Sequence, residues 1–434
     1  MLRPTLQLSI DGKDIPTSQF YDFTAFDSVD TTLPQLSFKI RDPDGQLLSR
    51  LAIKIGSEVN IKIFDQEEDL MKLVASKEEY DLCKFSVTKV YDGMELGLSS
   101  GAGFIQIWCI QSWALYGDYQ GKAYKPALIS SIVEDVCKNI NKSAGIDSED
   151  IEIEESTDAG KNPRYKCNES DIEFIEKKLL PYCSVGESNA FFYVDLLGKV
   201  HLTSFNTMFA KKETALFSPI PEQTGQMDDP YDKQESLGLD GSLMYNSCKV
   251  SLGNEQIEKF WTHILKRCYL VDHTMGATLF GKIYPRVSIG KSGSSVYNVL
   301  PIETIKLAST EATGAFNYQF GILDDQLNRT INDDLYLNDI FSVTLTTVNE
   351  DPRVVVGNTA YLQFPKVYTK NDLGKVKYLS HWLEGKWLVY SKMVTKNNKE
   401  AVGAMYTLIK PMITLSEKKN AVAMPFTLYG GINK

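Results

Sequence analysis

Residues 55–63, Ile-Gly-Ser-Glu-Val-Asn-Ile-Lys-Ile, and residues 356–364, Val-Gly-Asn-Thr-Ala-Tyr-Leu-Gln-Phe, carry the same pattern. Each begins with an apolar residue, a glycine and two polar residues, and every second residue that follows is apolar. Glycine readily adopts the backbone conformation of a tight turn, and an alternation of period two predicts a strand with one buried face. The repeat therefore predicts two similar β-barrels in one chain, with chance similarity of two short strands as the alternative.

The first hundred residues read as antiparallel β-structure around the first of these stretches. In residues 5–10 every second residue is apolar, and Asp11-Gly12 then predicts a turn. Further strands are expected at residues 35–41, 58–64, 80–91 and 104–113. The charged stretch 65–79 is expected to be a loop or a short helix that projects from the barrel. Several short strands with no helix between them indicate a barrel or a sandwich.

The period of the apolar pattern changes after Trp113. Pro126 suits the first turn of a helix. The apolar residues that then share one helical face are Leu128, Ile132, Val136 and Ile140. A second helix is expected over 168–182, where Ser170 and Glu173 have the spacing of a capping box. Residues 190–195 and 200–205 predict a hairpin around a Leu197-Gly198-Lys199 turn, so this region is expected to be a compact α+β insert.

Alternating segments return in the last part of the chain, after a stretch rich in proline and polar residues. They are residues 243–252, 295–306, 340–348, 353–364, 386–392 and 404–411. The expected fold is mainly β with an α+β insert and two tube-like β-barrel domains. Its expected parts are a first barrel (1–114), the insert (115–205), a linker (206–240), a second barrel with extra loops (241–411) and an extended tail (412–434).

Composition limits the classes of function. The chain has 434 residues, of which 43% are hydrophobic, and a formal net charge of −10. The acidic balance argues against a protein held to nucleic acid by phosphate contacts. No apolar run reaches the roughly 18 residues of a membrane helix, and a signal peptide is not expected.

Cysteine and histidine usage gives no metal or disulfide pattern. No CxxC pair occurs, so free thiols in a reducing compartment are expected. The cysteines are Cys83, Cys109, Cys137, Cys167, Cys183, Cys248 and Cys268, and the histidines are His201, His263, His273 and His381. No two histidines lie close enough for a helical metal pair.

Two short motifs resemble catalytic signatures without their context. Residues 276–283 have the spacing of a phosphate-binding loop, but Ile283 replaces the required Ser or Thr and Pro285 opposes the following helix. Residues 97–101, Gly-Leu-Ser-Ser-Gly, match a nucleophile elbow but lie between two expected strands. The first is not interpreted as a nucleotide site, and the second is interpreted as a flexible turn between two strands.

Three pairs of adjacent acids and one histidine are the remaining candidates for a catalytic role. The adjacent acid pairs are Asp228-Asp229, Asp324-Asp325 and Asp333-Asp334. Adjacent acids in polar segments are expected to be solvated, and His381 is expected at the end of a strand. No catalytic, cofactor-binding or metal-binding residue is assigned, and the chain is not expected to be an enzyme.

Four stretches, taken in order, resemble a known family. They are the aromatic-rich residues 20–45 ending in Asp-Pro-Asp-Gly, the Gly-polar-polar strand 55–63, residues 168–205 with Ser-Asp-Ile-Glu-Phe-Ile and Phe-Phe-Tyr-Val-Asp, and the closing strands within 381–409. Their order is similar to that of the baseplate hub proteins of contractile-tailed bacteriophages. These hubs are related to the late-control D proteins and to the hub part of type VI secretion spikes.

The resemblance implies a structural role. Such hubs are trimers in which each subunit gives two barrels, so that a pseudo-sixfold ring joins the hexameric tail tube to the trimeric spike. The implied partners are two further copies of the chain, the spike, the tube or its initiators, and other baseplate proteins. Genomic DNA would pass through the lumen without specific binding. The implied location is the virion tail, assembled in the bacterial cytoplasm, with no membrane insertion and no cofactor.

Three alternatives stay open at this point. One is the hub of a secretion or tailocin machine. The second is a cell-wall hydrolase that uses scattered acids, and the third is a β-rich glycan-binding module of a tail.

Overall fold

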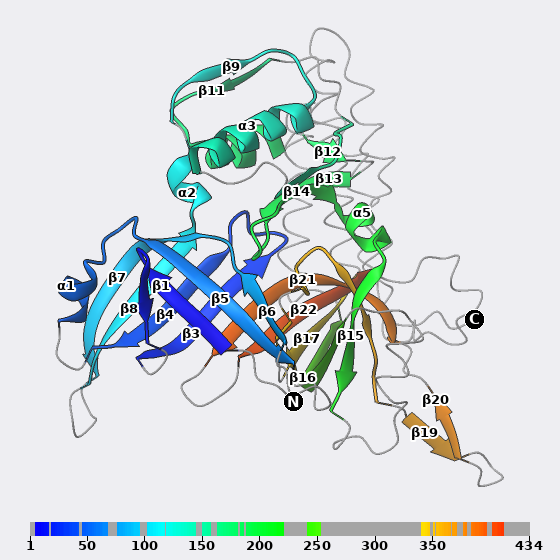
Figure 1. Cartoon of the computed structure of the whole chain (residues 1–434). Coiled ribbons are helices and arrows are strands. Elements are labelled where there is room, and N and C mark those ends of the chain that lie inside the picture. Colours follow the sequence, from blue (N-terminus) through cyan, green and yellow to red (C-terminus); the bar gives the residue numbers. More distant parts are fainter. Residues whose placement is uncertain are drawn as a thin grey trace, which may run out of the picture. The chain divides into compact units, whose positions relative to one another are not determined.

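The computed structural model describes residues 5–220, 241–252 and 340–411, apart from short gaps inside the first and last of these ranges. Nearly all of the described residues fall into one compact unit made of Met1–Gly186, Ala190–Val250 and Val343–Ile409. This unit is mainly β with few helices, as expected (Figure 1).

The strands of the first barrel enclose one hydrophobic core. Its strands are β1 (Thr5–Ile10), β2 (Lys13–Ile15), β3 (Phe20–Ser28), β4 (Gln35–Arg41), β5 (Glu58–Glu67), β6 (Ser76–Asp81), β7 (Phe85–Glu95) and β8 (Ala102–Gln111). They are hydrogen-bonded in the order β3-β4-β8-β7-β5-β1-β2, and β6 pairs with β5. Helix α1 (Leu47–Leu51) lies between β4 and β5 in the sequence.

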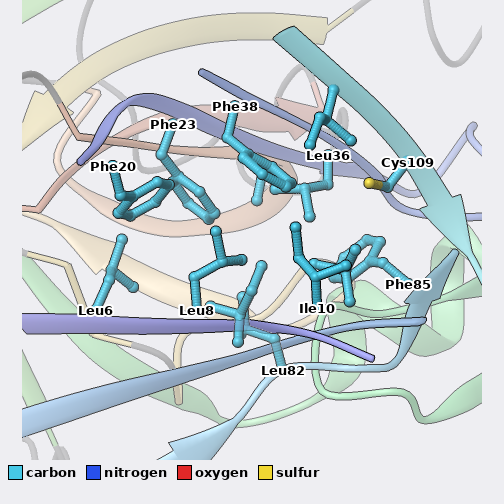
Figure 2. Close-up of a cluster of buried hydrophobic side chains, with 14 of the residues drawn as sticks. Leu6, Leu8, Ile10, Phe20, Phe23, Leu36, Phe38, Leu82, Phe85 and Cys109 are labelled. Atoms are coloured by element: carbon cyan, nitrogen blue, oxygen red, sulfur yellow. The ribbon is translucent and has the colours of Figure 1, made fainter. Parts of the chain in front are cut away.

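The alternation seen in the sequence decides which side chains enter this core. Leu6, Leu8 and Ile10 of β1 are at most 2% exposed. They face Phe20 and Phe38, which come from β3 and β4 at the other end of the strand order (Figure 2). Because residues from both ends of the order share one core, the sheet is curled into a barrel.

The second barrel is a closed ring of six strands. They are β15 (Glu213–Pro219), β16 (Gly241–Leu252), β17 (Ile340–Thr347), β18 (Thr359–Leu362), β21 (Gly385–Lys396) and β22 (Gly403–Pro411). The order β18-β15-β16-β17-β22-β21 closes because β21 also pairs with β18. A separate hairpin, β19 (Val367–Lys370) and β20 (Val376–Leu379), lies between β18 and β21 in the sequence.

The α+β insert has its own core. Helix α2 (Trp113–Tyr116) leads into β9 (Lys122–Tyr124) and the amphipathic α3 (Ile129–Ala144). The remaining elements are β10 (Ile151–Ile153), β11 (Arg164–Lys166), α4 (Asp171–Phe174) with its π-helical continuation η2 (Ile175–Leu179), β12 (Ser184–Val185), β13 (Ser188–Val194), β14 (Val200–Ser204) and α5 (Phe205–Ala210). The expected capping box is confirmed, since the Ser170 side chain accepts from the Glu173 N–H and the Glu173 side chain accepts from the Ser170 N–H.

Several sequence predictions were wrong in part. The expected strand 80–91 is divided between β6 and β7, and of the expected strand 353–364 only β18 is a strand. The stretch 65–79 is not a loop or helix throughout, because β5 continues to Glu67 and β6 begins at Ser76. The expected linker 206–240 contains α5 and β15, and β15 is a buried strand of the second barrel. Helix α3 begins at Ile129, three residues after Pro126, and Leu128 already accepts the Ile132 N–H.

The reasons are physical. Strand β6 pairs with β5 although its sequence, Ser-Lys-Glu-Glu-Tyr-Asp, has the charged composition of a loop. Strand β15 has an uninterrupted buried run rather than an alternation, and Pro219 at its end suggested a linker.

Several other predictions lie outside the described residues: the strand at 295–306, the tail 412–434, the motifs at 276–283 and 97–101, the three acid pairs and His381.

Candidate functional site at the joint between the barrels

The glycine loops of the two barrels have the same hydrogen bonds. Gly56 has φ +88° and its N–H donates to the Val87 carbonyl at 2.8 Å. Gly357 has φ +77° and its N–H donates to the Val389 carbonyl at 2.9 Å. A positive φ is what favours glycine at both places. The repeat seen in the sequence is therefore a repeat of structure.

Each glycine loop is also tied back to a strand that contains a bulge. The Val87 N–H donates to the Ser57 carbonyl at 2.9 Å, and the Val389 N–H donates to the Asn358 carbonyl at 2.8 Å. One residue further on, the register of β7 with β8 and that of β21 with β22 both shift. A bulge adds twist and can end the pairing of a strand with its partner. Strands β7 and β21 are therefore each divided into one half before the bulge and one half after it.

The second half of β21 joins the barrels. Residues 385–388 pair with β18 and close the second barrel, whereas residues 391–396 pair with residues 23–28 of β3 in the first barrel. The equivalent half of β7, residues 89–95, pairs with β8 and has no second ladder partner among the described residues. Its Tyr91 side chain is 53% exposed.

A second exposed strand end belongs to β16. In the strand order, β16 of the second barrel corresponds to β3 of the first. Strand β3 is followed by β4 and β8, and β16 is followed by β17 and β22, the strands that correspond to β4 and β8. Residues 241–245 of β16 pair with β15. Of the next residues, Asn246, Ser247, Lys249 and Val250 are exposed.

The β13–β14 hairpin of the insert contacts the joint, which is the place where β21 of the second barrel pairs with β3 of the first. Its turn follows β13, where Gly198 adopts φ +90°. The Leu196 N–H donates to the Asp27 carboxylate of β3 at 3.0 Å, and the Cys83 N–H donates to the Leu196 carbonyl at 2.8 Å. On the other barrel, the Tyr193 hydroxyl lies so close to Gly357 that a Cβ there would be 1.8 Å from it. One hairpin thus contacts both barrels.

Buried charge surrounds this hairpin. His201 Nε2 lies 2.9 Å from Asp195 Oδ2, and the His201 ring stacks on Tyr193 with centroids 4.8 Å apart. Burial, reinforced by the Asp195 carboxylate, raises the pKa of Asp27 well above its usual value, although backbone hydrogen bonds and the positive charge of Lys392 oppose the shift. These groups orient the turn of the hairpin.

Lys392 is the buried cation of the joint. Its backbone lies opposite that of Asp27 in the β21–β3 ladder. Its side-chain Nζ lies 2.7 Å from the Glu350 carboxylate. The same Nζ donates to the carbonyls of Asp351 and Val354 at 2.9 and 2.8 Å. A buried ammonium needs this number of acceptors, so Lys392 fixes the segment before Gly357.

Sequence reasoning assigned no role to most of these residues. His201 was identified only as one of four histidines, and Asp27 only lay within the stretch 20–45. Asp195 and His201 flank the predicted Leu197-Gly198-Lys199 turn, and that was the available local signal. Within the described part of the chain, no group of three or more His, Cys, Asp or Glu side chains is placed to hold a metal ion, and no helix is both long and apolar enough to cross a membrane.

Comparisons with known proteins find likeness in structure only. No family model matches the sequence, and no curated protein matches it. The chain is similar to the 43 kDa tail protein of prophage MuSo2 from Shewanella oneidensis, with 11% identity, a TM-score of 0.48, and coverage of 93% of this chain and 97% of the other. A tail protein from Neisseria meningitidis MC58 gives 7% identity and a TM-score of 0.48, with coverage of 94% and 96%.

A further similar structure comes from a secretion system. The E. coli c3393 protein is described as a component of the type VI secretion system with similarity to phage T4 tail proteins. It gives 10% identity and a TM-score of 0.44, and the match covers 94% of this chain and 77% of that chain. These three structures are two tail proteins and one component of a secretion system.

Proposed function

We propose that the chain is the structural hub of a phage tail baseplate, a trimer whose barrels form a pseudo-sixfold ring between the hexameric tail tube and the trimeric spike. One observation carries the proposal: the chain contains the same barrel loop twice and joins its two barrels edge to edge through β21 and β3. Two such units in each chain allow threefold symmetry to match sixfold symmetry. The order of the sequence motifs, which resembles that of hub proteins, supports the same role.

The internal joint supplies a model for the contact between copies. In one chain the second half of β21 pairs with β3. The repeat equivalents are residues 89–95 of β7 and the exposed end of β16. We therefore expect β7 of one copy to pair with β16 of the next. This contact is head-to-tail, so it generates a closed ring when its rotation closes after three copies.

The net charge fits a ring through which DNA passes. A formal charge of −10 per chain repels phosphate wherever acidic groups face the lumen. Passage without retention predicts no measurable binding of duplex DNA by the assembled ring, even at low salt. Retention of DNA at about 50 mM salt would contradict this part of the proposal.

Photo-cross-linking tests the contact between copies. Tyr91 is replaced by the photoreactive residue p-benzoyl-phenylalanine, a conservative change at an exposed aromatic position. Irradiation should give an intermolecular product whose cross-linked peptide contains residues 241–252. The same replacement at Tyr119, which is 65% exposed on the insert, is the matched control and should not give this peptide. A Tyr91 product confined to one chain, or none, would contradict the proposed pairing.

A further inference from the structure

A cavity of about 620 Å³ opens in the α+β insert, away from the barrel joint. Its walls come from four elements: the segment after α2, the strand pair β9–β11, the last turn of α3 and the start of α4. The lining side chains that matter here are Tyr116, Lys122, Tyr124, Lys142, Lys166 and Asp171. The volume lies in the range of pockets that hold a ligand or several side chains.

A buried ion pair is part of the cavity lining. Lys166 of β11 is 3% exposed and Asp171 of α4 is 6% exposed, and the Lys166 ammonium bonds the Asp171 carboxylate. Burial of two charges costs several kcal/mol of desolvation per ion before their attraction is counted. This pair puts a fixed ammonium and a carboxylate partner in the cavity wall.

Further positive charge sits beside this pair. Lys122 is the direct cross-strand partner of Lys166 in the β9–β11 ladder, so both side chains lie on the same face. Like charges directly opposite each other on a ladder are destabilising. Asp171 neutralises Lys166, and the Lys122 ammonium lies 4.6 Å from the centre of the Tyr124 ring. A carboxylate brought to Lys122 would form a second ion pair beside that of Lys166 with Asp171.

The opposite wall adds another cation. Lys142 is an exposed residue in the last turn of α3 and also lines the cavity. Three lysines against one aspartate leave the named lining positively charged in a chain whose net charge is −10. Lys122 and Lys142 stand on different walls, so a ligand with separated negative groups fits better than a single small ion.

We propose that this cavity binds a carboxylate-rich segment of a partner protein, with separate acidic side chains reaching Lys122 and Lys142. The internal Lys166–Asp171 pair shows the type of contact that the two exposed lysines would repeat. The proposal rests on the insert alone and does not depend on a ring of barrels.

Binding of a labelled peptide tests the proposal. The full chain is titrated into a fluorescein-labelled hexaglutamate peptide at about 50 mM salt, and anisotropy is recorded, with hexaglutamine as the uncharged control. The double substitution Lys122→Gln and Lys142→Gln should weaken binding about tenfold, from the loss of two partly exposed ion pairs. Lys138→Gln, which removes an exposed α3 lysine paired with Glu134 outside the cavity, should leave binding within about twofold.

Three outcomes would overturn the proposal. The first is equal weakening by Lys138→Gln, which would indicate general charge attraction. The second is full competition by citrate or phosphate at the peptide's own concentration, which would indicate a small-anion site. The third comes from the unmodified protein, where bound hexaglutamate should protect Lys122 and Lys142 from reductive methylation more than Lys138. Equal labelling of the three lysines would overturn the proposal without relying on a variant.

Discussion

The two glycine loops have the same backbone but different surroundings. At Gly56 the nearest atom to an added Cβ would be Cδ1 of Leu115, at 3.8 Å, whereas at Gly357 it would be the buried Tyr193 hydroxyl, at 1.8 Å. The loop of the second barrel is the seat of the insert hairpin, and that of the first barrel is open. The comparison shows that the repeat preserves the turn and the bulge while the contacts outside the loop diverge.

The strands that follow the loops differ in the same way. Lys392 stands three residues after Val389, and Val90 stands three residues after Val87. Val90 packs partly buried against the first hydrophobic core. Lys392 is buried and ion-paired with Glu350. An apolar contact in one barrel is thus replaced by a charged one in the other, at the strand that joins the barrels.

The largest expected effect follows from breaking that ion pair. Lys392→Met leaves the Glu350 carboxylate buried without its cation, which should cost about 3–5 kcal/mol of unfolding free energy in a urea titration. Adding Glu350→Gln should recover much of the loss, because the stranded charge is removed. A loss for Lys392→Met below about 1 kcal/mol would show that the pair does not support the joint.

The glycine loops give the next effect. Gly357→Ala meets both a left-handed backbone and the Tyr193 hydroxyl, and should cost about 3–4 kcal/mol. Gly56→Ala meets only the backbone conformation and should cost about 1–2 kcal/mol. Thermal unfolding of both variants measures the difference. Equal losses would mean that the hairpin does not press on the second loop.

At Gly103 and Gly403 the substitution by alanine should cost more stability in the first barrel than in the second. A Cβ at Gly103, at the start of β8, would lie 2.3 Å from the Asp42 backbone oxygen, while a Cβ at Gly403, at the start of β22, would lie 3.2 Å from that of Thr347. Gly103→Ala should therefore cost about 2–3 kcal/mol and Gly403→Ala about 1 kcal/mol or less. Here the first barrel is the more sensitive one, and a larger loss for Gly403→Ala would be the wrong sign.

The smallest expected effect is a pH dependence at the joint. Burial and the Asp195 carboxylate raise the pKa of Asp27, so the folded chain holds this proton more tightly than the unfolded chain. The resulting stability is complete below the unfolded pKa and is lost as pH rises through the folded pKa. Asp27→Asn, which keeps an oxygen acceptor for the Leu196 N–H, should remove this dependence.

Urea titrations of the wild type and of Asp27→Asn from about pH 4 to neutrality measure this dependence. The wild type should lose stability relative to the variant as pH rises. Parallel curves would place the folded pKa of Asp27 near its usual value.

The features that could be predicted from the sequence are those determined by residues close together in the chain. The glycine before each half-buried strand revealed the repeat, and Ser170 with Glu173 marked the start of α4. Strand β15 was missed because a strand buried on both faces has no alternation, and Pro219 suggested a linker. Strand β6 was missed because its charged residues look like those of a loop.

The joint lay beyond such reasoning because its partners are far apart in the sequence. Nothing near Lys392 indicates Glu350 or Asp27 as neighbours, and nothing near Gly357 indicates Tyr193. The cavity of the insert could not be predicted either, since its lysines come from separate elements.

The mass of the full chain in solution, by size-exclusion chromatography with light scattering, tests the central claim most directly. One chain has a mass of 48.8 kDa. The hub account predicts a particle of three times this mass, formed by the chain alone or on mixing with a trimeric tail-spike protein. A particle that stays a monomer or a dimer under both conditions would contradict the account.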